Sequence, residues 1–142
     1  FPTRRSSDLE INAYAAKLMQ KLGISEIADN DVNEVSGGQL QRACICRSLI
    51  NHPRILFADE PTGALNKQSS HEVMEELNRI HKEGTSILLV THDMKVASRC
   101  DRVLYIEDGN IRDEMQLGAW EDCTDIRKRE RRLNEWLITL GW

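Results

Sequence analysis

Two short apolar runs constrain the fold of this 142-residue chain more than any other feature of its sequence. Residues 55–58 are continuously apolar and lead into an Asp-Glu pair, while residues 87–90 are continuously apolar and lead into Thr-His-Asp. A strand that is apolar at every position is typical of a sheet that is buried on both faces. We therefore expect buried strands at 55–58 and 85–90, each with polar side chains directly after it.

The residues between these two strands predict a helix. Asn66 is suited to cap its start, and Gly84 is suited to end it. Four residues of this segment share one helical face: Val73, Leu77, Ile80 and His81. Strand, helix and strand in this order form a βαβ unit, whose two strands run parallel in one sheet. The sequence therefore predicts an α/β fold with a mostly parallel sheet.

Two more helices are predicted before this unit. Apolar residues at positions 11, 15, 18, 19 and 22 share one helical face, and Gly23 ends that helix. Residues 24–35 are polar and loop-like. Ser36 is a good N-cap for the next helix, which we expect to end near Ile50 because Pro53 prevents it from continuing far.

The C-terminal part predicts a β-hairpin followed by a helix. Asp108-Gly109 is a strong turn signal between strands at 102–107 and 110–115. A helix is expected over 125–140, where four apolar residues lie on one side: Leu133, Trp136, Leu137 and Leu140. Its basic run at 127–132 is interrupted by a glutamate, so we interpret it as a solvated face rather than a patch for nucleic acid. Three tryptophans are expected to pack this tail onto the sheet: Trp120, Trp136 and Trp142.

Composition excludes several classes of protein. With 40% hydrophobic and 30% charged residues, the chain is typical of a globular domain with a core. The net charge of -4 gives no basic field for nucleic acid or anionic lipid, and no apolar run is long enough to cross a bilayer. The cysteines lack the C-x-x-C spacing of a zinc site, and Cys44 and Cys46 are expected to be small core residues. We expect a reducing, cytosolic compartment without disulfides.

The first nine residues match none of these patterns. They have no apolar periodicity, and they resemble the translation of a common sequencing adapter. We expect residues 1–9 to be a non-native tail, with natural sequence beginning near Glu10; a polar N-terminal arm is the alternative. Since the chain begins with Phe1 and has no signal peptide, we also expect it to be a fragment of a cytosolic protein.

Ser36-Gly37-Gly38 opens the second helix with two glycines. The glycines leave backbone N–H groups unshielded, the helix dipole adds partial positive charge, and the serine hydroxyl adds a further donor. Such a corner suits a terminal phosphate. These three residues alone favour an ordinary capped helix start, but the following run Gln39-Leu40-Gln41-Arg42 favours the phosphate site.

The polar residues after the two strands form the second group of candidates. Asp59 and Glu60 end a buried parallel strand, and such strands end at the ligand-binding edge of an α/β sheet. His92 follows the other strand and precedes an acid. The alternatives are a pair of solvated acids and an exposed or structural histidine. Their order along the chain, rather than their residue types, favours a functional interpretation; three other histidines match no motif, namely His52, His71 and His81.

These motifs together resemble the second half of an ABC-type ATPase nucleotide-binding domain. The resemblance rests on Val35-Ser36-Gly37-Gly38-Gln39, with Val35 where the family usually has Leu, and on the residues that follow the two apolar runs, Asp59-Glu60-Pro61-Thr62-Gly63 and Thr91-His92-Asp93. It implies the C-terminal part of a P-loop NTPase (RecA-like) domain with a remnant of the helical signature subdomain. The implied parts are a helical subdomain at 10–52, an ATPase core at 53–115 and a C-terminal helical tail at 116–142.

The resemblance implies a role for each candidate residue. Ser36-Gly37-Gly38-Gln39 corresponds to the signature loop, which contacts the γ-phosphate of ATP held by the opposite subunit. Asp59 resembles the Walker B aspartate that supports Mg²⁺ through water, and Glu60 resembles the general base that polarises the attacking water. Asn66 stands in the D-loop, where the family typically has Asp, and keeps the hydrogen-bonding geometry without the charge. His92 matches the switch histidine, which touches the γ-phosphate.

The implied function is that of an ATP-binding and ATP-hydrolysing subunit with ATP and Mg²⁺ as cofactors. Its partners are a second copy, with ATP sandwiched between the two, and a membrane permease; no nucleic acid is expected. The implied location is cytoplasmic, on the inner face of the plasma membrane. The closest likeness is to bacterial subunits for peptide-antibiotic or lipoprotein-type export.

One motif of the family is not in this sequence. No G-x-x-x-x-G-K-[ST] loop occurs in the 142 residues, so we expect the ATPase activity to belong to a longer parent and this chain to be inactive alone. The alternative functions are a non-transport ABC ATPase of DNA repair or translation, and an inactive remnant that only dimerises.

Overall fold

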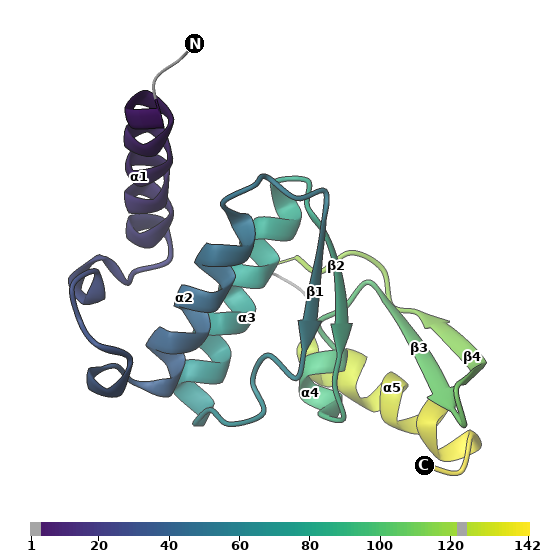
Figure 1. Ribbon diagram of the computed structural model, residues 1–142. Helices are drawn as coiled ribbons and strands as arrows, with labels where there is room; N and C mark the ends of the chain where they lie inside the picture. The colour runs from purple at the N-terminus through teal and green to yellow at the C-terminus, as the bar shows by residue number, and fades with distance from the viewer. Residues whose placement is uncertain (1–3, 122–124) are drawn as a thin grey trace. The chain divides into compact units, whose positions relative to one another are not determined.

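The computed structural model describes residues 4–121 and 125–142, and the chain divides into two compact units after Val90. The first unit contains, in chain order, α1 (Arg4–Lys21), the 3₁₀ turns η1 (Ser25–Ile27) and η2 (Val32–Glu34), α2 (Gly37–Leu49), β1 (Ile55–Asp59), α3 (Lys67–Lys82) and β2 (Ser86–Val90) (Figure 1). The second contains α4 (Met94–Ala97), β3 (Arg102–Glu107), β4 (Asn110–Gln116) and α5 (Ile126–Thr139).

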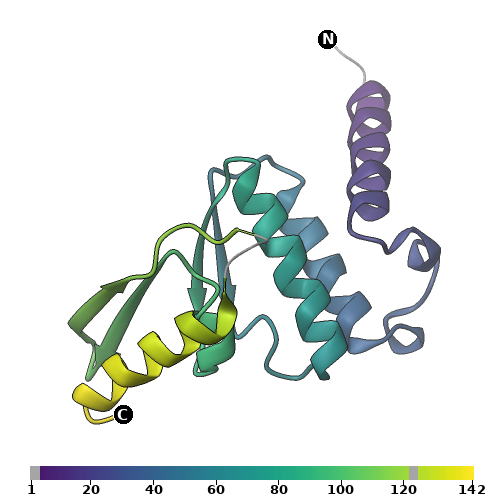
Figure 2. The same cartoon turned by 180° about the vertical axis from the view of Figure 1, so that it is seen from behind.

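The βαβ unit predicted from the sequence is confirmed. β1 and β2 pair in parallel, with Ile55 beside Ser86 at one end and Asp59 beside Val90 at the other. α3 connects them and lies side by side with α2 in both views (Figures 1 and 2). The buried stripe of α3 comprises Val73, Met74, Leu77 and Ile80. The fold is therefore α/β with a parallel strand pair, as the sequence predicts.

The expectation that both strands are buried on both faces is wrong for the described residues. Alternate side chains along the strands are strongly exposed: Ile55 at 47%, Phe57 at 70%, Leu88 at 46% and Val90 at 56%. Between them, Leu56 is only 6% exposed. A continuously apolar run shows that both faces of a strand are apolar enough to be buried by other elements. Within residues 4–121 and 125–142, only one face receives it.

The N-terminal helix differs from its prediction in length and burial. α1 begins at Arg4 rather than near residue 11, because no glycine or proline interrupts the chain from there to Gly23. Of the predicted apolar face, Leu18 and Leu22 are buried while Ile11 is 50% exposed. The helical backbone at 4–8 does not test the proposed origin of residues 1–9, which stays a prediction.

The segment between α1 and α2 is more ordered than its polar sequence suggests. It forms η1 and η2, and its two isoleucines, Ile24 and Ile27, are 0% and 9% exposed. Burying these side chains anchors a segment whose other residues are polar. The prediction that this whole segment is a loop is therefore wrong, because it contains two single turns of 3₁₀ helix.

The hairpin and the last helix are confirmed. β3 and β4 pair antiparallel, and Asp108 and Gly109 both adopt positive φ, at 50° and 74°, as a type I′ turn requires. Asp125 caps α5 by accepting hydrogen bonds from two backbone N–H groups of its first turn. Trp136 packs edge-on against Tyr105, as expected for tail packing, and its Nε1 donates to Asp113 at 3.0 Å.

Two expectations about single side chains are wrong. Arg129 lies in the basic run predicted to be a solvated face, yet it is only 7% exposed. Cys44 is exposed, although it was expected in the core beside Cys46, which is buried. Burial raises the pKa of the Cys100 thiol to about 11, so this thiol is held in its neutral form. Cys123 lies outside the described residues.

Candidate functional site

The N-terminus of α2 is built by a reciprocal cap. Ser36 Oγ accepts a hydrogen bond from the Gln39 backbone N–H at 3.2 Å, and Gln39 Oε1 accepts one from the Ser36 backbone N–H at 2.8 Å. The predicted N-cap is thus confirmed. Ser36 and Gly37 are exposed and Gly38 is buried, so the accessible part of this helix start is its cap and its first residue.

The second glycine of this loop has a packing role that the sequence did not reveal. A Cβ on Gly38 would lie 2.8 Å from Ser69 Oγ and 2.9 Å from Ser69 Cβ, so a side chain here collides with the first turn of α3. A Cβ on Gly37 would meet only the flexible end of Leu65, at 3.3 Å. Gly38 is therefore needed for the close contact of α2 with α3, whether or not its amide binds an anion.

We expect Gly38→Ala to lower the free energy of unfolding of the chain by about 1–3 kcal/mol, because the added methyl group overpacks the contact with Ser69. Gly37→Ala is the matched control and should change stability much less. Urea denaturation measures both. In a Ser69→Gly background, Gly38→Ala should lose most of its effect; an undiminished loss there would contradict the packing explanation.

The start of α3 adjoins the start of α2. Asn66 caps α3, with Oδ1 accepting from the Ser69 backbone N–H at 2.9 Å, so the predicted cap is confirmed. An ion pair between Arg42 and Glu72, at 2.5 Å, joins the two helices further along. The hydrogen bonds from Gln68 and Arg42 lower the pKa of the Glu72 carboxyl. The structure thus brings the Ser36 loop and Asn66 to one end of a helix pair.

The acidic pair lies at the carboxyl end of β1. Asp59 is exposed and Glu60 is half-buried. The Glu60 backbone N–H donates to Val90 O at 2.9 Å, which extends the pairing of the strands by one residue, and Glu60 O accepts from the Gly63 N–H at 3.1 Å. Glu60 has φ of 43°, a left-handed conformation that is strained for a residue with a Cβ. Strained backbone of this kind gathers at functional sites, and here it falls on the candidate base.

The histidine candidate follows the other strand. His92 is exposed, two residues beyond Val90, at the beginning of the second unit. The next residue, Asp93, donates its N–H to Thr91 Oγ1 at 3.0 Å and caps α4 by accepting from the Lys95 N–H at 2.8 Å. His92 is therefore presented by a short turn that is bonded on both sides of it.

The predicted metal support is a single exposed carboxylate, that of Asp59. In the part of the chain that the structure describes, no group of three or more His, Cys, Asp or Glu side chains comes together as a metal site. Mg²⁺ commonly takes one or two carboxylates together with water and phosphate oxygens. An exposed carboxylate such as Asp59, at the edge of a parallel strand pair, is compatible with that kind of binding.

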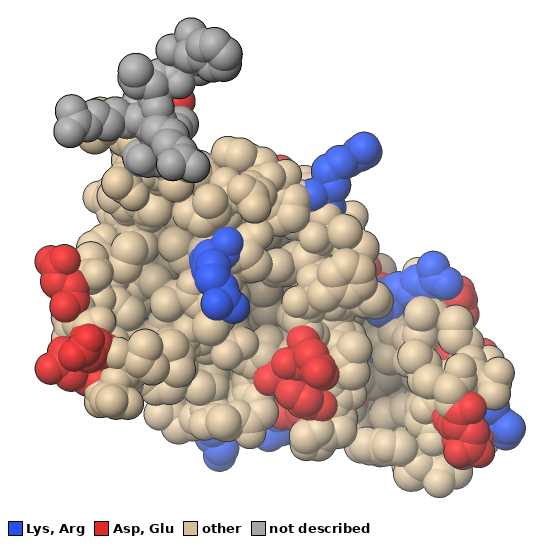
Figure 3. Space-filling model, viewed as in Figure 1, with Lys and Arg blue, Asp and Glu red and all other residues tan. Residues whose placement is uncertain are grey.

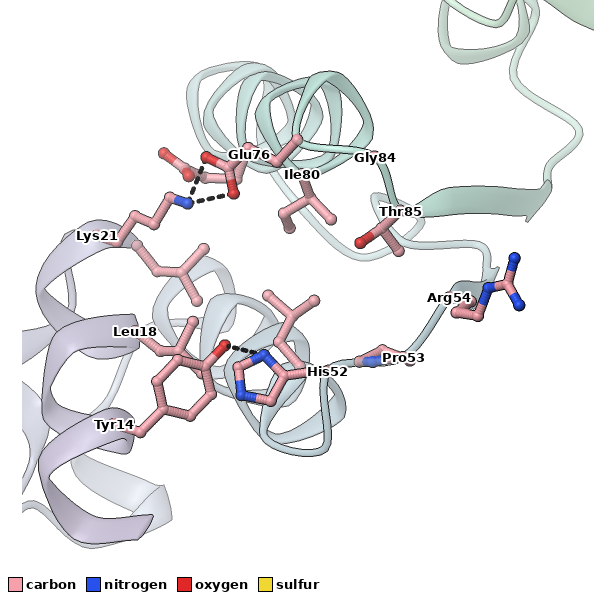
Figure 4. A pocket seen from close by; sticks show the side chains of 13 residues that line it. Tyr14, Leu18, Lys21, His52, Pro53, Arg54, Glu76, Ile80, Gly84 and Thr85 are labelled. Carbon is pink, nitrogen blue, oxygen red and sulfur yellow. Dashed lines mark hydrogen bonds and ion pairs between the residues drawn. The ribbon is translucent and has the colours of Figure 1, made fainter. Parts of the chain in front are cut away.

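A pocket of about 330 Å³ was not predicted from the sequence. Its wall includes Tyr14 and His52, whose rings lie 4.4 Å apart and whose Oη and Nδ1 atoms are 3.1 Å apart (Figure 4). The ion pair of Lys21 with Glu83 also lines it. Tyr14 and His52 are 38 positions apart, so no local spacing indicates their contact. The lining residues of this pocket include none of the predicted site residues.

On the face shown in Figure 3, acidic and basic side chains of the described residues are scattered over the surface. Among the described residues, no helix combines the length and apolar character needed to cross a membrane.

Comparisons with known proteins agree on one family. The family model described as ABC transporter matches residues 1–63. The macrolide export ATP-binding/permease protein MacB of Bartonella henselae is 47% identical over 97 residues, which are 68% of this chain and 15% of that protein. The corresponding protein of Shewanella sp. is 46% identical over 103 residues, or 72% of this chain and 16% of that protein. The matched part thus spans about one sixth of these relatives.

Solved structures give the same family. The dimeric structure of MJ0796, a bacterial ABC transporter cassette, is 34% identical with a TM-score of 0.66, covering 76% of this chain and 47% of that one. A post-hydrolysis state of the same cassette, bound to ADP and Pi, is 35% identical with a TM-score of 0.59, covering 82% and 48%. This chain therefore spans about half the length of these cassettes and belongs to the ATP-binding cassette family of ABC transporters.

Proposed function

We propose that this chain supplies the catalytic acids, the switch histidine and the signature loop of an ATP-hydrolysing subunit that drives a bacterial membrane permease. One observation carries the proposal. Two adjacent parallel strands end in register at Asp59 and Val90, and the polar motifs follow directly, with Glu60 after the first strand and Thr91-His92 after the second. Acidic and imidazole groups at the carboxyl ends of parallel strands are well placed for phosphate chemistry.

Glu60 is the proposed general base. Its carboxylate accepts the proton of a water molecule as that water attacks the γ-phosphorus of ATP, the bond to the β–γ bridging oxygen breaks, and ADP and inorganic phosphate result. The hydrogen bond from the Glu60 N–H to Val90 O fixes the backbone of this residue at the strand edge. Asp59, one residue earlier, is the proposed support for Mg²⁺, which neutralises charge on the phosphate oxygens when bound.

The Ser36 loop is proposed to act on the ATP of a second copy. Its exposed start, at Ser36 and Gly37, lies at the positive end of the α2 dipole, which suits a terminal phosphate approaching from outside. The proposed phosphate contacts come from Ser36, Gly37, Gly38 and Gln39. Asn66, at the adjoining end of α3, is proposed to contact the same neighbouring copy, and His92 to touch the γ-phosphate bound by its own copy.

Export is the proposed use of the hydrolysis. The curated relatives described above are named as macrolide export proteins that combine ATP-binding and permease parts. We propose a permease partner at the inner face of the plasma membrane and a peptide-antibiotic, lipoprotein or comparable amphiphilic cargo. A non-transport ABC ATPase is the alternative, and it predicts an ATPase that does not fractionate with a permease.

ATP hydrolysis and MgATP binding by the 142 residues alone test which part of the nucleotide site this chain holds. We expect negligible ATP hydrolysis and weak MgATP binding, because the sequence contains no glycine-rich loop with its phosphate-binding lysine. We define the joined cassette as a fusion protein in which the first half of a related cassette, carrying G-x-x-x-x-G-K-[ST], precedes these 142 residues. ATP hydrolysis should appear in this joined cassette. Phosphate release and titration with a fluorescent ATP analogue measure both proteins. An inactive but folded joined cassette would contradict the proposed function and favour a dimerising remnant.

A further inference from the structure

Arg129 is a buried cation that the basic run of α5 did not predict. Its guanidinium Nε donates to Ser98 O and its Nη2 to Cys100 O, both at 2.7 Å. The same group also donates to the three consecutive carbonyls of 117–119, at 3.1 to 3.4 Å. The arginine stays 7% exposed. A planar group with five N–H donors is suited to collect several carbonyls in this way, whereas the point charge of a lysine is not.

Two of these carbonyls directly follow α4: Ser98 is the C-cap residue of that helix, and Cys100 lies two residues further on. That helix covers only Met94–Ala97, so it is too short to be stable from its own hydrogen bonds. Its last carbonyls accept from the residues that follow it, with the Arg99 N–H donating to Val96 O and the Cys100 N–H to Ala97 O, and a cation at a helix C-terminus also complements the dipole. Ser98 itself is 0% exposed. The residues that directly follow α4 are therefore fixed by Arg129, from a different part of the chain, in addition to the local hydrogen bonds at the helix end.

The beginning of α4 carries the candidate histidine. Asp93 caps the helix, and His92 is the residue immediately before this cap. Only one turn of helix separates the cap from Ser98, whose N–H donates back to Met94 O at 2.9 Å. A displacement at one end of such a short element is transmitted to the other end, because there is no further turn to absorb it.

We propose that Arg129 is a positioning residue for His92, acting by clamping the C-terminal end of the helix that presents the histidine. The proposal rests on the proposed role of His92 in ATP hydrolysis. Trp120 completes the clamp: the centroid of its ring lies 5.6 Å from the Arg129 guanidinium carbon, and its backbone N–H donates to Asp101 Oδ1 at 3.1 Å. The C-terminal helix thereby contributes to the geometry of the nucleotide site without touching ATP.

Hydrogen–deuterium exchange of the 142-residue chain tests the clamp. In Arg129→Met, amide exchange of 97–100 should accelerate at least about tenfold, with smaller changes in the hairpin and in α5. Arg132→Lys is the matched control, since Arg132 is an exposed arginine of the same helix that donates to Gln116 O. Leu133→Ala removes a core side chain of α5 and should accelerate exchange evenly across the unit. Unchanged exchange at 97–100 in Arg129→Met, or an even acceleration like that of Leu133→Ala, overturns the proposal. Arg129→Lys repeats the test if the methionine variant does not fold.

Turnover by the joined cassette separates this proposal from the role of His92. Arg129→Met should lower kcat at least about tenfold with the KM for MgATP within about twofold, and should add little further loss in a His92→Ala background. A full additional loss in that background overturns the coupling to His92. If His92→Ala alone leaves kcat unchanged, the proposed role of His92 is wrong, while the exchange experiment still decides whether Arg129 clamps α4.

Discussion

Glu60→Gln in the joined cassette is expected to slow ATP turnover by about 10²–10⁴-fold and to leave the Kd for MgATP within about twofold. Glutamine keeps the size and shape of the side chain but cannot accept the proton of the attacking water. The hydrogen bond from the backbone N–H of residue 60 to Val90 O does not depend on the side chain, so the strand edge should be preserved. Steady-state phosphate release and equilibrium titration with MgATP measure the two quantities.

Two controls make this result specific. Glu10→Gln changes an exposed acid on α1 and should leave turnover unchanged. Asp59→Asn should instead weaken the Mg²⁺-dependent part of ATP binding, because its carboxylate is the proposed support for the metal. Turnover by Glu60→Gln within about threefold of the unchanged protein would show that another group activates the water.

Gly37→Asp is expected to abolish ATP turnover while each copy still binds MgATP with nearly unchanged affinity. The new carboxylate would stand at the exposed start of α2, where the proposal places a phosphate of the neighbouring copy, and like charges repel. The fold should tolerate the change. A Cβ on Gly37 meets only the end of the Leu65 side chain, and an acid in the first turn complements the helix dipole. Isothermal titration and phosphate release measure binding and turnover separately.

The choice of Gly37 rather than Gly38 is decided by the structure. An acid at position 38 would collide with Ser69, so a loss of activity there would mix misfolding with repulsion. Gly37→Ala adds the Cβ without the charge and should retain most of the turnover. If Gly37→Asp lowers the affinity of a single copy for MgATP as much as it lowers turnover, the loop acts within its own subunit and the trans assignment is wrong.

Local sequence signals predicted much of this fold because their physical causes are local. Ser36 and Asn66 are short polar residues before helices, and both cap as expected. Asp108-Gly109 predicts its turn because both positions need positive φ. The parallel pair follows from two apolar runs joined by one helix. The candidate residues of both units were proposed in the same way, from motif order.

The features that escaped prediction depend on contacts between distant segments. Arg129 is indistinguishable from its basic neighbours until Ser98, Cys100 and 117–119 are brought around it. The need for glycine at position 38 arises from Ser69, on another helix. The 70% exposure of Phe57 could not be predicted either. An apolar run shows which side chains of a strand can be buried, but not whether another element covers them.

The mass in solution of the Glu60→Gln joined cassette, with and without MgATP, tests the ATP sandwich most directly. This variant should bind ATP without consuming it, so a closed state should persist. Light scattering after size-exclusion chromatography should give the mass of one cassette without nucleotide and of two cassettes with saturating MgATP. Adding Gly37→Asp should return the mass to that of one cassette while ATP remains bound. A mass of one cassette for Glu60→Gln with saturating MgATP, or a doubled mass that survives Gly37→Asp, would contradict the proposed sandwich.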